Sequence, residues 1–277
     1  MLLTNSDILK RLEVIGSQGQ NVLNIGEAAL LLANLDLPKN SFEKYQDEIN
    51  LIASDLSTAS REAKSLPDRI TSLSETLYKK HRFQGDVETY DDPQNANLMH
   101  VIDRRKGLPV ALGILAIHVG RTQGWDIAGL NFPGHFLLRI SKSDEYVLID
   151  PFNEARLVVN EDLQKLFRRI HNQNMPQQSD FVQSVSDRDV LVRLQNNIKI
   201  RALREGDKER AIKILQSIVL ITPTSVEFLA ELAMLEASSG HIKSAVERLE
   251  RFIERNPDIS NASSILSLKE QLNRSLN

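Results

Sequence analysis

The chain has 277 residues, of which 41% are hydrophobic and 26% charged, so it is long enough for one large globular domain or two modest ones. Its 34 Lys and Arg residues nearly balance 37 Asp and Glu residues, and the net charge of −3 argues against a nucleic-acid or membrane-binding surface. It contains no cysteine, which excludes disulfides, thiolate metal sites and cysteine nucleophiles together.

The N-terminal residues 1–81 predict a helical region packed on the core. Apolar residues recur at near-helical spacing over 8–35. Ser41 stands where a helix N-cap is expected, and Pro67 suits the first turn of a further helix that runs to His81. The start of the chain lacks the basic and apolar segments of a signal peptide, and no run reaches the roughly 18 apolar residues of a membrane-spanning helix. We therefore expect a cytoplasmic protein.

Residues 82–170 predict the core of the fold. Residues 82–97 have no periodicity and many turn formers, which favours an ordered covering loop, with a ligand-binding loop as the alternative. Pro109 suits the first position of a helix that is apolar on every side as far as Val119, and such a helix is buried. His118 is the polar exception on this helix, and we interpret it as a satisfied core or boundary histidine.

Three short strands are predicted after this helix, over 127–130, 136–140 and 146–149. His135 would open the second strand and Asp150 would close its antiparallel neighbour. A hairpin of that length brings its two ends side by side, which places an imidazole next to a carboxylate. Such a pair orients the nucleophile in a nucleophile–His–Asp site. A purely structural pairing of the two residues is the alternative.

The C-terminal part of the chain contains an internal repeat of 34 residues. The matching positions are Gly206 and Gly240, Ala211 and Ala245, Leu215 and Leu249, and Pro223 and Pro257. This period, with small residues at fixed offsets and a closing proline, is typical of tetratricopeptide repeats, each a helix–turn–helix pair. We expect a polar linker over 171–187, then two repeats and a capping helix over 188–277.

The repeats predict a protein or peptide partner, bound in a groove lined by the first helix of each pair. Candidate partner-binding residues on those helices are Asn196, Lys199 and Glu231. Short basic clusters with acids nearby are expected to be solvated faces rather than a nucleic-acid site. These clusters lie at 79–82, 104–106 and 168–169. No cofactor, nucleic acid or membrane partner is expected, and the oligomeric state is left open.

From Gly107 onwards the chain resembles the transglutaminase-like core, a papain-related fold with a small antiparallel sheet. The residues that carry the resemblance are Gly107, Arg121, Gly124, His135 and Asp150-Pro151. The resemblance implies a His–Asp pair together with a cysteine nucleophile at the start of the central helix. That nucleophile position falls on Pro109, give or take one residue, and neither Leu108 nor Val110 supplies a nucleophile.

The whole chain resembles one bacterial subgroup of that superfamily, which is grouped with a proposed regulator of invasion genes. The subgroup combines a helical N-terminal region, a transglutaminase-like core and C-terminal tetratricopeptide repeats. The matching runs are Gly26–Leu30, the loop with Phe83, Gly85, Tyr90, Pro93 and Asn95, Arg105–Pro109, Phe132–Leu137 and Ile149–Phe152. The chain departs from the subgroup at Asp86, Ala96 and Asn153–Ala155, which bears on any ligand role of the loop and of the turn after Asp150.

These observations predict a mostly helical α+β protein and leave three functional hypotheses. The first is a non-catalytic transglutaminase-like protein that acts in protein–protein interaction, with a regulatory role, since a chain without cysteine cannot form a thiolate. The second is a cysteine-free hydrolase or acyl-transfer enzyme, in which His135 is a general base oriented by Asp150. The third is a metal site that adds His100 or His118 to that pair, although no two histidines lie four residues apart.

Overall fold

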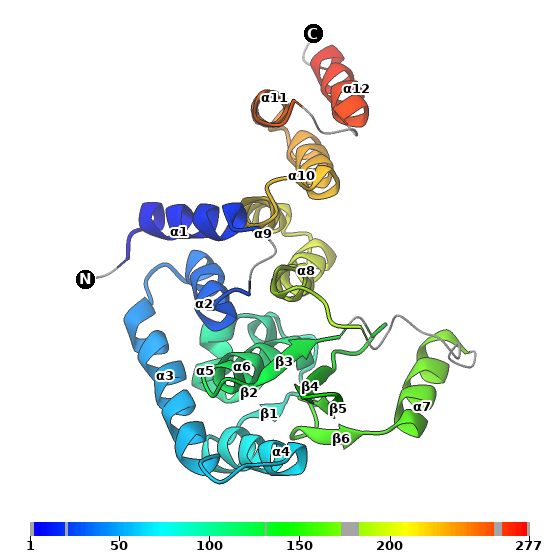
Figure 1. Ribbon diagram of the computed structural model, residues 1–277. Coiled ribbons are helices and arrows are strands. Elements are labelled where there is room, and N and C mark those ends of the chain that lie inside the picture. The colour runs from blue at the N-terminus through cyan, green and yellow to red at the C-terminus, as the bar shows by residue number, and fades with distance from the viewer. Residues whose placement is uncertain (1–2, 20–21, 131, 173–182, 258–261, 276–277) are drawn as a thin grey trace. The chain divides into compact units, whose positions relative to one another are not determined.

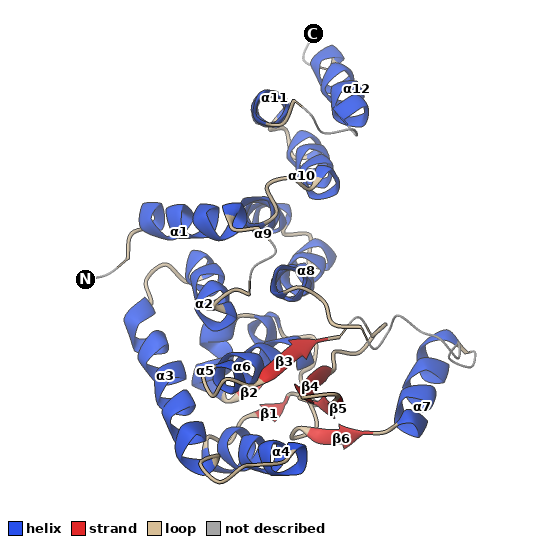
Figure 2. Ribbon diagram, in the orientation of Figure 1, coloured by secondary structure: helices blue, strands red, loops and turns tan. Residues whose placement is uncertain are grey.

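The computed structural model describes residues 3–19, 22–130, 132–172, 183–257 and 262–275. The chain divides into two compact units. The first consists of Met1–Ile8 and Gln20–Leu194, and the second of Leu9–Gly19 and Gln195–Asn277. The expected class is confirmed, because helices predominate and the larger sheet is small and antiparallel (Figures 1 and 2).

The N-terminal helices of the first unit follow the expected capping signals. They are α2 (Ile25–Asp36), α3 (Phe42–Ala59), α4 (Leu66–Ser74) and the π-helix η1 (Glu75–Lys80). Ser41 caps α3 by accepting a hydrogen bond from the Lys44 N–H, as its position predicts. The helix expected up to His81 changes type on the way, since the His81 N–H donates to the Thr76 carbonyl five residues back at 3.0 Å.

The central helix α6 (Pro109–Arg121) is buried over nearly its whole length, as its apolar composition predicts. It follows β1 (Gln84–Gly85), the 3-10 turn η2 (Pro93–Ala96), α5 (Leu98–Arg104) and β2 (Lys106–Gly107). It packs against α2, α3 and the sheet. Gly113 permits the closest approach, because a Cβ there would lie 2.4 Å from the ring of Phe136. The start of the central hairpin therefore rests on the first turns of α6.

The sheet has four antiparallel strands in the order β3-β4-β5-β6. These are β3 (Asp126–Gly129), β4 (Leu138–Lys142), β5 (Glu145–Asp150) and β6 (Arg156–Val158). The first three were expected from the sequence and β6 was not. Helix α7 (Asn160–His171) then covers part of the sheet, with Leu163 and Phe167 packed in one cluster with Leu148 and Val158.

Part of the segment expected to be a linker is packed against the sheet. Ser184 forms an antiparallel bridge with Leu130, and the Val185 N–H donates to the Gly129 carbonyl at 2.9 Å. Residues 173–182 lie outside the described residues. The chain next to α8 is therefore tied to the β3 edge of the sheet.

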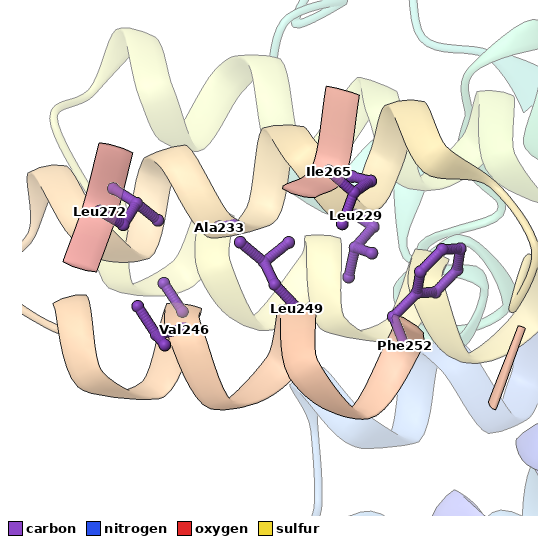
Figure 3. Close-up of a cluster of buried hydrophobic side chains, with 8 residues drawn as sticks. Leu229, Ala233, Val246, Leu249, Phe252, Ile265 and Leu272 are labelled. Atoms are coloured by element: carbon purple, nitrogen blue, oxygen red, sulfur yellow. The ribbon is translucent and has the colours of Figure 1, made fainter. Parts of the chain in front are cut away.

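The second unit contains the expected helix pairs. Its helices are α8 (Asp187–Arg204), α9 (Lys208–Ile221), α10 (Val226–Ser238), α11 (Ile242–Arg255) and α12 (Ala262–Arg274). The first residues of α8, 187–194, belong to the first unit. Figure 3 shows Ile265 and Leu272 of α12 packed in one buried cluster with Leu229 and Leu249, so α12 covers the last repeat as predicted.

The N-terminal helix α1 (Asn5–Ser17) contributes most of its length to the second unit, whereas the sequence predicted that it packs on the core with the rest of residues 1–81. Its Gly16 lies against the end of α9, where a Cβ would approach the Leu220 carbonyl oxygen to 2.1 Å. The absence of a side chain at Gly16 is therefore what allows α1 to contact the repeats so closely. Among all helices of the described residues, none is long and apolar enough to cross a membrane.

Candidate functional site

The structure brings His135 and Asp150 together as the hairpin length predicts. His135 lies in the turn before β4, and Asp150 is the last residue of β5. The register of the two strands pairs Leu138 with Ile149, which carries the two polar residues to the same end of the hairpin. His135 Nε2 lies 2.9 Å from Asp150 Oδ2.

Asp150 is an ionised carboxylate that accepts several hydrogen bonds. Its side chain is 4% exposed, and it accepts hydrogen bonds from the Phe152 N–H at 2.9 Å and from Asn153 Nδ2 at 2.7 Å. Burial alone would raise the pKa of Asp150, but the hydrogen bond from His135 and those from its other donors outweigh it and hold that pKa below its usual value. Because an ionised carboxylate can only accept, the hydrogen between the two residues belongs to His135 Nε2.

The second ring nitrogen of His135 is the atom available to a ligand. The His135 side chain is 18% exposed. Within the described parts of the chain, Nδ1 has no hydrogen-bond partner, and it is not fully enclosed. A neutral imidazole with its proton on Nε2 presents a lone pair at Nδ1, which can accept a proton from water or from a hydroxyl.

No side-chain nucleophile stands at the start of α6. Pro109 is the first residue of the helix and is buried, and its buried neighbours Leu108 and Val110 are aliphatic. Leu108 also offers no side-chain cap to the helix. The position at which the resemblance implies a nucleophile therefore carries buried side chains with no nucleophilic group.

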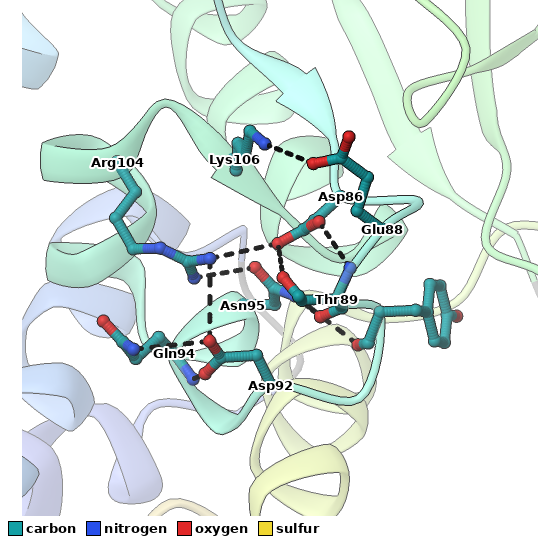
Figure 4. A network of polar contacts seen from close by, with 9 residues as sticks. Asp86, Glu88, Thr89, Asp92, Gln94, Asn95, Arg104 and Lys106 are labelled. Atoms are coloured by element: carbon teal, nitrogen blue, oxygen red, sulfur yellow. Dashed lines mark hydrogen bonds and ion pairs between the residues drawn. The ribbon is translucent and has the colours of Figure 1, made fainter.

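The loop over residues 82–97 is held by a buried polar network, shown in Figure 4. Asp86 accepts the Thr89 N–H at 2.9 Å and the Thr89 hydroxyl at 2.6 Å, and it pairs with Arg104 at 3.0 Å. Arg104 also donates to Asn95 at 2.9 Å. Burial alone would raise the pKa of Asp86, but the hydrogen bonds from Thr89 outweigh it and lower that pKa to about 2. This network favours the interpretation of an ordered covering loop.

The same loop reaches the turn after Asp150. The ring of Tyr90 meets that of Phe152 edge to face, with the ring centroids 5.8 Å apart. Gly85 permits a second contact, because a Cβ there would lie 2.5 Å from the Phe152 ring. The loop therefore stabilises the turn in which the carboxylate sits.

The basic cluster at 104–106 is not the solvated face that the sequence predicted. Arg104 pairs with Asp86, Arg105 with Glu48 and Lys106 with Glu88, and the two arginine side chains are 25% and 32% exposed. The prediction was wrong because the acids that neutralise this cluster lie on other segments of the chain. Because the paired residues are far apart in the sequence, the sequence alone did not reveal these ion pairs.

His118 is a core histidine, although it is not a satisfied one. It is 7% exposed and faces Gly26, where a Cβ would lie 2.6 Å from its ring. Its Nε2 is buried and has no hydrogen-bond partner among the residues that the structure describes, and burial lowers the pKa of His118. Across the described residues, no group of three or more His, Asp or Glu side chains could hold a metal ion.

Arg121, which the resemblance places on the family frame, is part of a polar junction that sequence reasoning missed. Its Nη1 lies 2.6 Å from Asp187 Oδ2, and its Nε donates to the Ile127 carbonyl at 3.1 Å. Asp187 also accepts the Leu23 N–H at 2.9 Å. Asp187 therefore joins the segment before α2 to the end of α6, and Arg121 adds a contact with β3.

The three candidate partner-binding residues have different surroundings. Lys199 Nζ contacts both carboxylate oxygens of Glu231, at 2.7 and 2.8 Å, and the lysine side chain is 9% exposed. These two residues therefore join α8 to α10 instead of standing free. Asn196 is half-buried, and its Oδ1 is enclosed and has no hydrogen-bond partner in the described part of the chain.

Exposed apolar side chains occur on the same two first helices. Ile200 and Leu203 on α8 are 45% and 39% exposed, and Met234 on α10 is 53% exposed. Ile200 and Met234 are 34 residues apart and so occupy the same place in successive repeats. The repeat period could have identified this apolar row, which consists of Ile200, Leu203 and Met234.

Comparison with protein families gives two matches that together span most of the chain. Residues 43–196 match the transglutaminase-like superfamily, and residues 198–273 match a tetratricopeptide repeat family. The boundary between the two matches falls within α8. The two matched regions correspond to the transglutaminase-like core and the tetratricopeptide repeats that the sequence predicts.

Several curated proteins are similar to this chain. A UPF0162 protein of Xylella fastidiosa is 26% identical over 246 residues, which are 88% of each chain. A UPF0162 protein of Pseudomonas aeruginosa is 28% identical over 200 residues, 71% of this chain and 72% of the relative. The F-box only protein 21 of Mus musculus is 30% identical over 95 residues, 31% of this chain and 15% of that protein.

A comparison with solved structures finds a crystal structure of menin at a TM-score of 0.44 and 9% identity. The likeness covers 98% of this chain and 70% of menin. The menin structure reveals the binding site for the Mixed Lineage Leukemia protein, a statement about menin alone.

Proposed function

The chain belongs to the transglutaminase-like superfamily, and from this premise we propose that it is a non-catalytic member that binds a partner protein through its tetratricopeptide repeats. A cytoplasmic location and a regulatory role are part of the proposal. The partner presents an apolar helix face to the first helices of the repeats. The observation that carries the proposal is the exposed apolar row of Ile200, Leu203 and Met234.

The absence of a nucleophile supports the non-catalytic part. The resemblance implies covalent acyl transfer through a thiolate at the start of α6, and the chain has no cysteine. Pro109 and both of its neighbours have unreactive side chains. The His135–Asp150 pair can orient and accept a proton, but the start of α6 offers it no side-chain nucleophile.

The surface of the repeats supports the partner-binding part. Lys199 and Glu231 are paired with each other, so charge recognition by these two would first require their separation. The apolar row, in contrast, exposes two aliphatic side chains and a flexible thioether on successive first helices. Burial of such side chains is what a partner helix would contribute to binding.

The test replaces one residue of the apolar row in the full chain. A partner captured by the wild-type chain from a bacterial lysate is purified, and its affinity is then measured against Met234→Asp. We expect binding weaker by about tenfold or more, because a carboxylate would be buried without a partner. Leu51→Asp on α3 is the matched control, since Leu51 is 52% exposed and lies in the first unit. Equal affinity of Met234→Asp and wild type would refute the proposal.

A second candidate function rests on the intact geometry of the pair. With Nε2 held at 2.9 Å by an ionised carboxylate and Nδ1 free of partners among the described residues, His135 could act as a general base towards water. Under this hypothesis the chain is a cysteine-free hydrolase or acyl-transfer enzyme. The observation in its favour is the oriented imidazole alone.

A screen of ester, amide and acyl-transfer substrates separates the two candidates. Wild type and His135→Ala are assayed together, and both melting temperatures are measured. Activity in the wild type that disappears in His135→Ala, at an unchanged melting temperature, would favour the enzyme and overturn the non-catalytic proposal. Equal background rates in both proteins are the result that we expect.

A further inference from the structure

The turn after Asp150 is held from the N-terminal helical region. The hydroxyl of Tyr78, on η1, donates to the Pro151 carbonyl at 2.8 Å in a buried contact. Lys79, the next residue of η1, pairs with Glu154 at 2.6 Å, but both of these side chains are more than half exposed. The buried contact is therefore the one protected from competition with water.

One peptide unit connects Tyr78 to the carboxylate of Asp150. The Pro151 carbonyl that accepts the Tyr78 hydroxyl belongs to the same planar unit as the Phe152 N–H. That N–H donates to Asp150 Oδ1 at 2.9 Å, while Asp150 Oδ2 meets His135 Nε2 at 2.9 Å. Because the unit is rigid, a contact that fixes its carbonyl also fixes the direction of its N–H.

The Tyr78 hydroxyl can donate this hydrogen bond at every physiological pH. Burial raises the pKa of Tyr78 far above its usual value, and the nearby charge of Asp150 adds to that shift. The hydroxyl therefore stays a donor. Tyr78 lies on a π-helical turn, which is closed by the hydrogen bond from the His81 N–H to the Thr76 carbonyl. Such turns are often found at functional sites.

We propose that Tyr78 is the positioning residue of the His135–Asp150 pair. Its hydroxyl fixes the peptide unit that holds the carboxylate, and the carboxylate fixes the imidazole. The role does not depend on partner binding by the repeats, so the two proposals can fail separately. It assigns part of the site to the N-terminal helices, outside the segment that contains the pair itself.

Tyr78→Phe tests the proposal, because it keeps the buried ring and removes the hydroxyl. Two NMR readouts are made on the full chain: titration of the Asp150 carboxyl carbon and the nitrogen shifts of the His135 ring. We expect the pKa of Asp150 to rise by about half a unit or more towards its usual value. We also expect His135 to change from one neutral tautomer to a mixture of two.

Ser74→Ala is the control, since the Ser74 hydroxyl donates to the Glu154 carbonyl at 3.1 Å in the same turn but not to the peptide unit after Pro151. It should leave both readouts as in the wild type. Unchanged readouts in Tyr78→Phe would overturn the proposal, whatever happens to the melting temperature. If Tyr78→Phe fails to fold, 3-fluorotyrosine at position 78 provides a stronger donor, and an unchanged pKa of Asp150 would then overturn the proposal.

Discussion

Arg121 and Asp187 form an ion pair of 2.6 Å between the end of α6 and the start of α8. Their side chains are 22% and 6% exposed, and Asp187 also accepts the Leu23 N–H. The carboxylate therefore joins three segments that are far apart in sequence. A charge buried in this way needs all its partners, since removing one leaves the others unpaired.

Asp187→Asn should lower the free energy of unfolding by about 2 kcal/mol, because a charge-assisted hydrogen bond is lost and Arg121 remains half-buried. Urea unfolding at neutral pH measures the change. Asp144→Asn, in the exposed turn between β4 and β5, is the control and should have little effect. Equal losses in the two variants would show that the pair does not contribute to stability.

Pro109→Cys should place a reactive thiol at the start of α6. The first helical position tolerates the change, and the resemblance implies that this position faces the His135 imidazole. A thiol placed there should therefore titrate below its ordinary pKa of about 8.5. The thiolate absorbance is measured against pH, alone and with His135→Ala added. We expect the second substitution to raise the thiol pKa by about one unit. The same titration curve in both proteins would mean that His135 does not reach this position.

Asp86→Asn should change how stability depends on pH. The pKa of Asp86 is lowered from 3.8 to about 2 in the folded chain, so its charged form stabilises the fold above about pH 4 and this contribution is lost as the pH falls through 2. The difference in unfolding free energy between wild type and variant should shrink by about 2 kcal/mol over that range. Urea titrations between pH 2 and 6 measure it, and two parallel curves would contradict the expectation.

His118→Leu should stabilise the chain. At neutral pH the gain is about 1 kcal/mol, because a buried nitrogen without a partner is replaced by an apolar group. The folded pKa of His118 lies below the ordinary histidine value of 6.5, so the unfolded chain binds a proton first and the wild type loses stability as the pH falls below that value. Unfolding at pH 7.5 and 5.5 checks both effects. If the variant is less stable than the wild type and loses as much unfolding free energy on acidification, His118 forms a hydrogen bond in the folded chain.

Local signals accounted for the elements that the sequence predicted. The cap at Ser41, the first-turn proline of α6 and the 34-residue period all act within one helix or one repeat. The His135–Asp150 contact was also predictable, because the two residues are joined by a single hairpin whose register is short-range.

The features that were missed depend on contacts between distant segments. β6 has three residues, too few to show alternation, and it is defined by its pairing with β5. The partner of Arg121 lies 66 residues away, and that of Lys199 lies 32 residues away on another helix. Likewise, nothing near His118 in the sequence reveals that its Nε2 is buried without a hydrogen-bond partner among the described residues.

Helix α8 contributes residues to both units, which limits how the chain could be divided or recombined. A fragment that began at residue 188 would lose Asp187, and Val190 would be separated from Gly129, which it closely approaches. The same fragment would lack residues 9–19, which complete the repeats from the other end of the chain. Exchange of the repeats between proteins as a self-sufficient cassette is therefore physically disfavoured, and the two halves are expected to be inherited together.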